Sequence, residues 1–177
     1  MLQPKSRDII ATTAVDLENG AQRMARLLEE AQRLMAERDP QALLQQVCAA
    51  ARPLTQASIV GVGIVDGSGV IDDFVAVGLD ARVVDELRQS MAGNHDHPAR
   101  AVFEAREIVR GVNPTGDPAA ICLPSSHPPV HSYVFVPVAS SSRVYGWLAL
   151  VEKEHAQVFS EEDTQLASTL GALAGMA

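Results

Sequence analysis

Hydrophobic and small residues recur alternately four and three positions apart over residues 7–37. They fall at Ile10, Ala14, Leu17, Ala21, Met24, Leu28, Ala31 and Met35. This spacing predicts one long helix with the a and d positions of a coiled coil. The alanines make a thin seam, so the helix either pairs weakly with a second copy or packs on its own domain. The narrow stripe slightly favours the homodimer.

A second helix is predicted immediately after the first. Asp39 suits an N-cap and Pro40 the first helical position, and the helix continues through QALLQQVCAAARPL. Cys48 lies on its apolar face, four residues after Leu44, and is expected to be a small core residue. The break divides the chain into an N-terminal helix, residues 1–38, and a folded domain, residues 39–177.

The remaining pattern alternates between strands and helices. Two β-rich runs flank the turn sequence DGSG and predict an antiparallel hairpin, and ARVVDELRQSM follows as a short helix. Two long strands, VHSYVFVPVAS and RVYGWLALVEK, are joined by a serine turn at residues 140–142. Ser160 and Asp163 form a capping box that begins the last helix.

This element order predicts an α+β fold with a central antiparallel sheet. The late strands are apolar on both faces, with Tyr133 and Phe135 on one and Val134 and Val136 on the other. We expect the N- and C-terminal helices to cover one face. The irregular segment 93–128, which contains a helical PARAVFEAR and a short strand EIVRG, is available to cover the other. A ligand chamber beneath this cover is expected.

Composition narrows the class of protein. Hydrophobic residues make up 47% and charged residues 20% of the 177 residues, which indicates a folded core. The net charge of −8 argues against a nucleic-acid partner. Two isolated cysteines exclude a CxxC zinc site. There is no apolar run long enough for a membrane span and no signal-peptide pattern, so a cytoplasmic chain without membrane contact is expected. Catalytic motifs such as GxSxG and HExxH are absent, so we do not expect an enzyme.

Several motifs together resemble the GAF domain, a small-molecule sensor module of bacterial signalling proteins. They are VGLD at 77–80, FVPV at 135–138, YGWLALVEK at 145–153 and FSEEDTQLA at 159–167. With the element order they cover roughly residues 40–177. The resemblance implies the GAF fold, with helices on one face of the sheet and a covered ligand chamber on the other.

The stretch from AVFEAREIVRG to YGWLALVEK more narrowly resembles the haem-binding first GAF domain of the mycobacterial dormancy sensor histidine kinases. There, a histidine followed by two prolines before the VPV strand is the proximal iron ligand, and the matching residue here is His127. Pro128 and Pro129 restrict the backbone beside it. Those kinases carry a tyrosine where this chain has Ala149, so the hydroxyl near bound oxygen is missing. Trp147, on the same strand face, is a candidate to fill that space.

The resemblance implies a sensor that binds haem b through His127 and responds to a diatomic gas (oxygen, carbon monoxide or nitric oxide) or to redox state. Its signal is expected to leave through the dimerising first helix and the last helix, toward an output or kinase domain if the chain continues. The expected hydrophobic walls of the haem site are Phe103, Ile121, Leu123, Tyr133, Phe135, Trp147 and Ala149. The alternative is a haem-free GAF module for dimerisation or scaffolding, or a sensor of another small molecule.

The other candidates carry weaker signals. His131 is either a second iron ligand or, preferably, a core histidine. His95 and His97 are expected in an exposed loop, and His97 is a possible residue on the distal side of the haem. His155 is expected to be exposed. Phytochrome-related GAF domains attach a bilin through a cysteine in the region of Cys122, but the cysteine–histidine pair is missing, and a small buried thiol is preferred. Cyclic-nucleotide-binding GAF domains carry an Asn-Lys, Phe, Asp-Glu signature, which this chain matches in part through Lys153 and Asp163. For these two residues, a structural ion pair is the preferred interpretation.

Overall fold

The computed structural model describes residues 4–67, 70–91 and 97–177, and the side chains of the first helix from residue 20 onward. The elements in chain order are α1 (Pro4–Ala36), α2 (Pro40–Thr55), β1 (Ala57–Val65), β2 (Ile71–Val77), α3 (Ala81–Met91), α4 (Pro98–Ala105), β3 (Val109–Val112), the 3₁₀ helix η1 (Pro118–Ile121), β4 (Ser132–Ala139), β5 (Val144–Lys153) and α5 (Glu161–Met176). The predicted helices and strands are present, and η1 is the element that the sequence pattern did not indicate.

The five strands form one sheet in the order β2-β1-β5-β4-β3. Each neighbouring pair is antiparallel. The predicted hairpins are β1–β2 and β4–β5, and the closing contact between them is β1 with β5, which are far apart in sequence. The expected α+β fold with a central antiparallel sheet is therefore confirmed.

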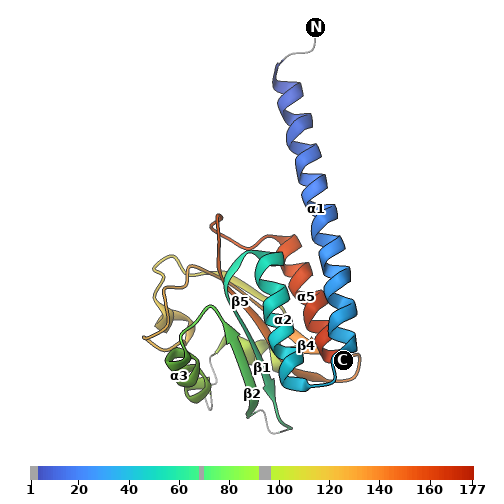
Figure 1. Cartoon of the computed structure of the whole chain (residues 1–177). Coiled ribbons are helices and arrows are strands. Elements are labelled where there is room, and N and C mark those ends of the chain that lie inside the picture. The colour runs from blue at the N-terminus through green and yellow to red at the C-terminus, as the bar shows by residue number, and fades with distance from the viewer. Residues whose placement is uncertain (1–3, 68–69, 92–96) are drawn as a thin grey trace.

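One face of the sheet is covered by α2 and α5, and α1 packs on these two helices (Figure 1). Alternate residues of the central strands point into this core, among them Val60, Val62, Val134, Val136, Leu148 and Leu150. Cys48 of α2 is fully buried here, as expected, and burial raises the pKa of its thiol to about 12. It is therefore a packing residue rather than a reactive thiol.

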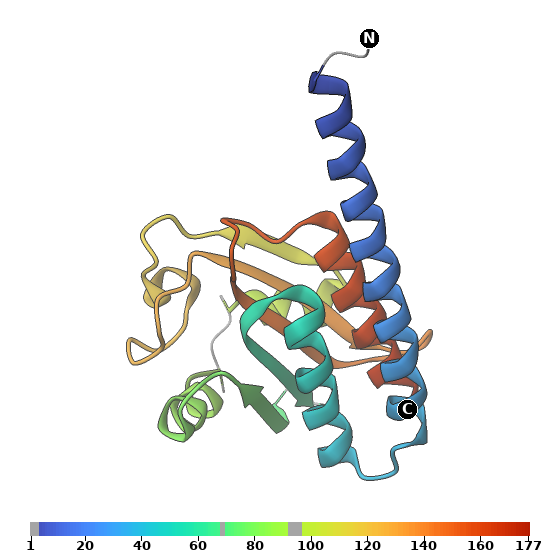
Figure 2. The ribbon, with the colours of Figure 1, turned by 45° about the horizontal axis from the view of Figure 1, so that its top comes forward.

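The opposite face of the sheet is covered by α3, by α4 and by the segment that contains η1 (Figure 2). The buried side chains there fall into two clusters. The first includes Ile59, Phe74, Leu87 and Leu123, and the second includes Val102, Phe135, Trp147 and Ala149. The long irregular segment therefore covers this face of the sheet, as predicted from the strands that are apolar on both faces.

The C-terminal half of α1 packs on its own domain, through residues that the predicted seam did not include. Leu27 and Leu34 are buried against α2 and α5. Met24, Leu28 and Met35 of the seam are more than half exposed. The side chains of Ile10, Ala14 and Leu17 lie outside the described residues. The apolar stripe is thus wider than a coiled-coil seam: one edge is used within the chain and the other faces outward.

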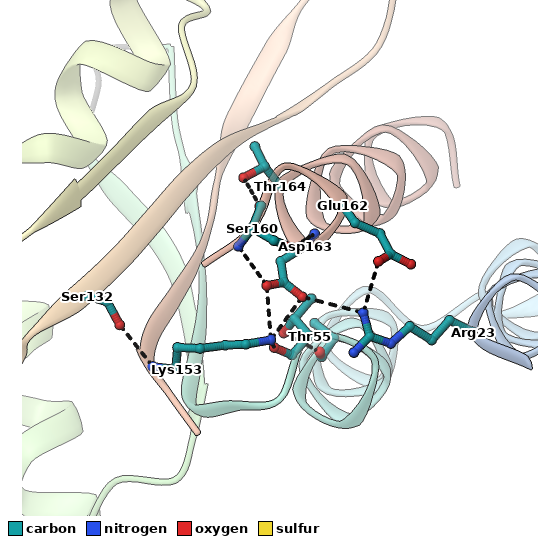
Figure 3. Close-up of polar contacts among 9 residues, drawn as sticks. Arg23, Thr55, Ser132, Lys153, Ser160, Glu162, Asp163 and Thr164 are labelled. Atoms are coloured by element: carbon teal, nitrogen blue, oxygen red, sulfur yellow. Dashed lines mark hydrogen bonds and ion pairs between the residues drawn. The ribbon is translucent and has the colours of Figure 1, made fainter. Parts of the chain in front are cut away.

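Four elements meet at a polar junction around Asp163 (Figure 3). Its carboxylate accepts from the backbone N–H of Ser160, which completes the predicted capping box of α5. It also pairs with the ammonium of Lys153, at the end of β5, and lies 3.9 Å from Arg23 of α1. Lys153 donates a further hydrogen bond to the carbonyl of Thr55 in α2. The predicted structural ion pair between Lys153 and Asp163 is therefore confirmed.

Candidate functional site

A hollow lies between the covered face of the sheet and its covering segments. Its floor is formed by four strands, and its cover carries two histidines. The floor residues are Ile59, Gly61, Phe74, Ala76, Phe135, Trp147, Ala149 and Val151, and the cover residues are Leu79, Leu87, His97, Leu123 and His127. Apart from the two imidazoles and the indole N–H of Trp147, these side chains are hydrocarbon. The hollow is therefore suited to a largely apolar ligand held by a few polar contacts.

The register between β1 and β5 places two of the three smallest floor residues opposite each other. Gly61 pairs with Ala149, and Gly63 pairs with Trp147. A Cβ atom on Gly63 would clash with the Trp147 ring, so the indole packs directly on the β1 backbone. A Cβ on Gly61 would meet the Phe74 ring at an ordinary 3.5 Å. The Gly61–Ala149 pair thus leaves this part of the floor without a bulky side chain of its own.

The hollow is narrow in this structure. It spans about 380 Å³ including its open mouth, but only about 30 Å³ is accessible to the centre of a water molecule. That is room for a water molecule or two. A larger ligand therefore requires the covering segments to move away from the sheet.

His127 lies in the loop after η1 and is 5% exposed. Its Nδ1 lies 2.7 Å from the carbonyl oxygen of Pro128. A carbonyl only accepts, so Nδ1 carries the proton and Nε2 keeps its lone pair. Burial lowers the pKa of His127, although the Pro128 carbonyl opposes this effect. The neutral ring with a backbone carbonyl on Nδ1 has the arrangement of histidines that bind metals.

His97 is buried as well, which corrects the expectation of an exposed loop. It is 5% exposed and forms the N-cap of α4, where its Nδ1 accepts from the backbone N–H of Ala99 at 3.1 Å. Its ring also meets the Phe135 ring edge to face, with centroids 5.7 Å apart. Burial lowers its pKa to about 4, so it is neutral near pH 7. Its neighbour His95 lies outside the described residues.

The remaining predicted site residues are placed as follows. Leu123, Phe135, Trp147 and Ala149 line the hollow together with His127. The other three, Ile121, Phe103 and Tyr133, are not among the residues that line the hollow. Ile121 belongs to the buried cluster around Phe74, Phe103 packs against the cluster around Trp147, and Tyr133 packs against both clusters.

His131 corrects the expectation of a core histidine. Its side chain is 51% exposed, and its Nδ1 lies 3.1 Å from the Glu152 carboxylate, away from the hollow. It fails as a core residue because it begins the bend before β4 rather than the strand itself. Cys122 is half-buried instead of buried, and it adopts a left-handed conformation, φ 61°, at the C-cap of η1. His155 is exposed, as expected.

Sequence reasoning missed Gly61, Phe74 and Ala76 of the floor because they lie on the β1–β2 hairpin, and no local signal in the sequence places this hairpin beside β5. His97 did carry one: a polar residue followed by Pro98 at the start of a helical pattern is typical of an N-cap. In the described ranges, no three His, Cys, Asp or Glu side chains gather into a metal site. Likewise, no described helix has the length and apolar character needed to cross a membrane.

Comparison with known proteins places this fold. The family model described as GAF domain matches residues 37–177. The GAF domain of an Acinetobacter phosphoenolpyruvate-protein phosphotransferase has a similar structure, with 17% identity, coverage of 86% of this chain and 90% of that one, and a TM-score of 0.67. The free methionine-R-sulfoxide reductase from Neisseria meningitidis, solved with its substrate, is also similar in structure. It has 18% identity, coverage of 88% of this chain and 87% of that one, and a TM-score of 0.63.

The second GAF domain of DevS from Mycobacterium smegmatis is also similar, with 18% identity, 77% and 90% coverage and a TM-score of 0.52. At these identities the structural neighbours establish the fold alone. The family match extends over most of the chain and agrees with the five-stranded sheet and its helices. The protein therefore belongs to the GAF domain family.

Proposed function

We propose that this GAF domain is a sensor that binds haem b through His127 and responds to a diatomic gas or to the redox state of the iron. The observation that carries the proposal is the state of His127. Its Nδ1–H is engaged by the Pro128 carbonyl, which leaves a lone pair on Nε2 of a buried imidazole that lines an apolar hollow. No catalytic role is proposed for this chain.

The residues fit a haem group in chemistry. A haem iron needs one protein imidazole and apolar walls, and His127 with Leu123, Phe135, Trp147 and Ala149 supplies them. Bound haem would supply an iron centre with a coordination position for a small gas and an accessible redox change. The volume of the hollow is smaller than that of a haem macrocycle. Haem entry therefore requires the cover formed by α3, α4 and the η1 segment to open.

The hollow also has a physical route to the helices. Trp147, Ala149 and Val151 of β5 face the hollow, and the same strand ends at Lys153, which binds Asp163 of α5. Asp163 in turn faces Arg23 of α1. A change in the position of β5 would therefore shift α5 and α1. We propose that these helices carry the signal to the output, and that α1 pairs with α1 of a second copy.

The test is an absorption spectrum of protein produced with a haem supply, before and after dithionite. We expect a Soret band near ~400 nm that shifts on reduction and is lost in His127→Ala. His131→Ala is the matched control, because it removes an exposed imidazole four residues away. Tightly bound haem that survives in His127→Ala, or is lost equally in His131→Ala, would overturn the assignment.

The second candidate is a haem-free module for dimerisation or scaffolding, which the narrow hollow favours. Colourless protein that takes up no added haemin would support it. A bilin attached through Cys122 would instead remain covalently bound in denaturant. Cys122 is not among the residues that line the hollow, which argues against that attachment.

A further inference from the structure

The two histidines of the hollow are in opposite proton states at their ring nitrogens. In His97 the N–H of Ala99 points at Nδ1, and a backbone N–H only donates, so Nδ1 is unprotonated. The neutral ring must then carry its proton on Nε2. In His127 the carbonyl of Pro128 requires the proton on Nδ1 and leaves Nε2 as a lone pair. One imidazole thus offers a donor and the other an acceptor.

The His97 donor is unusual because it has no acceptor. Among the described residues, its Nε2 is the buried side-chain nitrogen or oxygen that lacks any hydrogen-bond partner. Leaving a buried polar group unpaired costs roughly 1–3 kcal/mol. The side chain lines the hollow, and its Nδ1 edge is occupied by the backbone of α4. The Nε2–H edge is therefore the part of the ring that a ligand in the hollow can meet.

We infer that His97 is the hydrogen-bond donor to the small ligand sensed in this hollow, a role that rests on the proposed haem function of His127. A diatomic ligand on an iron held by His127 would present an acceptor atom inside an apolar space. The Nε2–H of His97 would donate to that atom and so gain the partner it lacks. Ala149, which has no hydroxyl, cannot take this role.

Trp147 provides a further side-chain N–H on the lining, besides the Nδ1–H of His127 that the Pro128 carbonyl engages. Its Cε2 and Cζ2 atoms, next to Nε1, lie against Gly63, which directs that edge of the indole toward the β1 backbone. The indole is therefore the weaker candidate. Trp147→Phe removes its N–H while keeping an aromatic ring, and it serves as the comparison.

The first experiment uses the protein without haem. Long-range ¹⁵N–¹H correlation spectra at pH 7 should contain a signal of a histidine protonated at Nε2 that disappears in His97→Ser. They should also contain a signal of a histidine protonated at Nδ1 that disappears in His127→Ala. Serine is chosen because it retains the N-cap of α4. A His97 ring protonated at Nδ1 would overturn the inference without any reference to haem.

The second experiment uses carbon monoxide as a probe on the haem-loaded, reduced protein. A hydrogen-bond donor near the probe lowers its C–O stretching frequency, so His97→Ser should shift the infrared band to higher frequency and Trp147→Phe should not. If haem binds through His127 but the band ignores His97→Ser, or moves only in Trp147→Phe, the inference fails and the haem function stands. If no haem binds, both fail together.

Discussion

The ammonium of Lys153 lies 2.9 Å from one carboxylate oxygen of Asp163 and 3.0 Å from the other, with both side chains almost completely buried. The pair joins the end of β5, a strand that lines the hollow, to the first turn of α5. Because each charge has been removed from water, each depends on the other.

Lys153→Met should therefore lower the free energy of unfolding by about 3 kcal/mol, since it leaves Asp163 as a buried charge without its main counterion. Urea denaturation monitored by circular dichroism measures the change. The double variant with Asp163→Asn should cost less than the sum of the two single variants.

Arg110→Met is the control for this pair. Arg110 forms an ion pair of 3.2 Å with Glu161 in the same turn of α5, but both side chains are exposed. Its loss should cost less than about 1 kcal/mol. Equal losses in the buried and exposed pairs would contradict the role given to burial.

Acid should weaken the fold through His97. Its pKa is about 4 in the folded protein and about 6.5 in the unfolded chain, so the unfolded state binds protons first as the pH falls. The stabilisation is complete above pH 6.5 and is lost between pH 6.5 and 4, by about 3 kcal/mol. The other titratable group on the hollow, His127, has its pKa lowered as well and acts in the same direction.

Urea denaturation at several pH values between 7 and 4.5 tests this dependence. The slope of the unfolding free energy against pH should be shallower in His97→Ser, which cannot take up the proton. His155→Ser removes an exposed histidine and should leave the slope unchanged. Parallel curves for wild type and His97→Ser would rule out the proposed source.

Ala149→Leu should fill the floor of the hollow and abolish haem uptake while the chain still folds. The added branch occupies the space above the Gly61–Ala149 pair, which holds only one or two water molecules. Haemin titration followed by absorbance measures uptake, and thermal unfolding checks the fold. Ala120→Leu adds the same bulk at an exposed site of η1 and should bind haem normally. Normal uptake by Ala149→Leu would place the ligand elsewhere.

Leu28→Glu should weaken the proposed dimer. Met24, Leu28 and Met35 form the outward edge of the α1 stripe, with exposed fractions of 54%, 60% and 63%, and a carboxylate there would be buried on pairing. Light scattering after size exclusion should show a shift toward the monomer mass. Glu29→Arg changes charge at an exposed position about 100° around the helix from Leu28 and should leave the mass unchanged. A monomeric wild-type protein would refute pairing through this edge.

Local sequence determined the elements of this protein. Asp39 with Pro40 and the Ser160–Asp163 capping box begin their helices as predicted, because the atoms that satisfy a helix end lie within three residues of it. The two-faced apolar pattern of β4 and β5 likewise predicted a covered sheet with helices on one side and a loop-rich cover on the other. The hydrophobic effect acts on each strand face in this local, periodic way.

Only the tertiary structure decided which residues meet. Nothing near Gly61 in the sequence indicates that it pairs with Ala149, because the register of strands that are distant in sequence depends on the packing of the whole sheet. The same reason separates the histidines: His97 is buried because α4 closes over Phe135, whereas His131 turns outward to Glu152. On α1, the positions of α2 and α5 selected Leu27 and Leu34 for the core and left Leu28 outside.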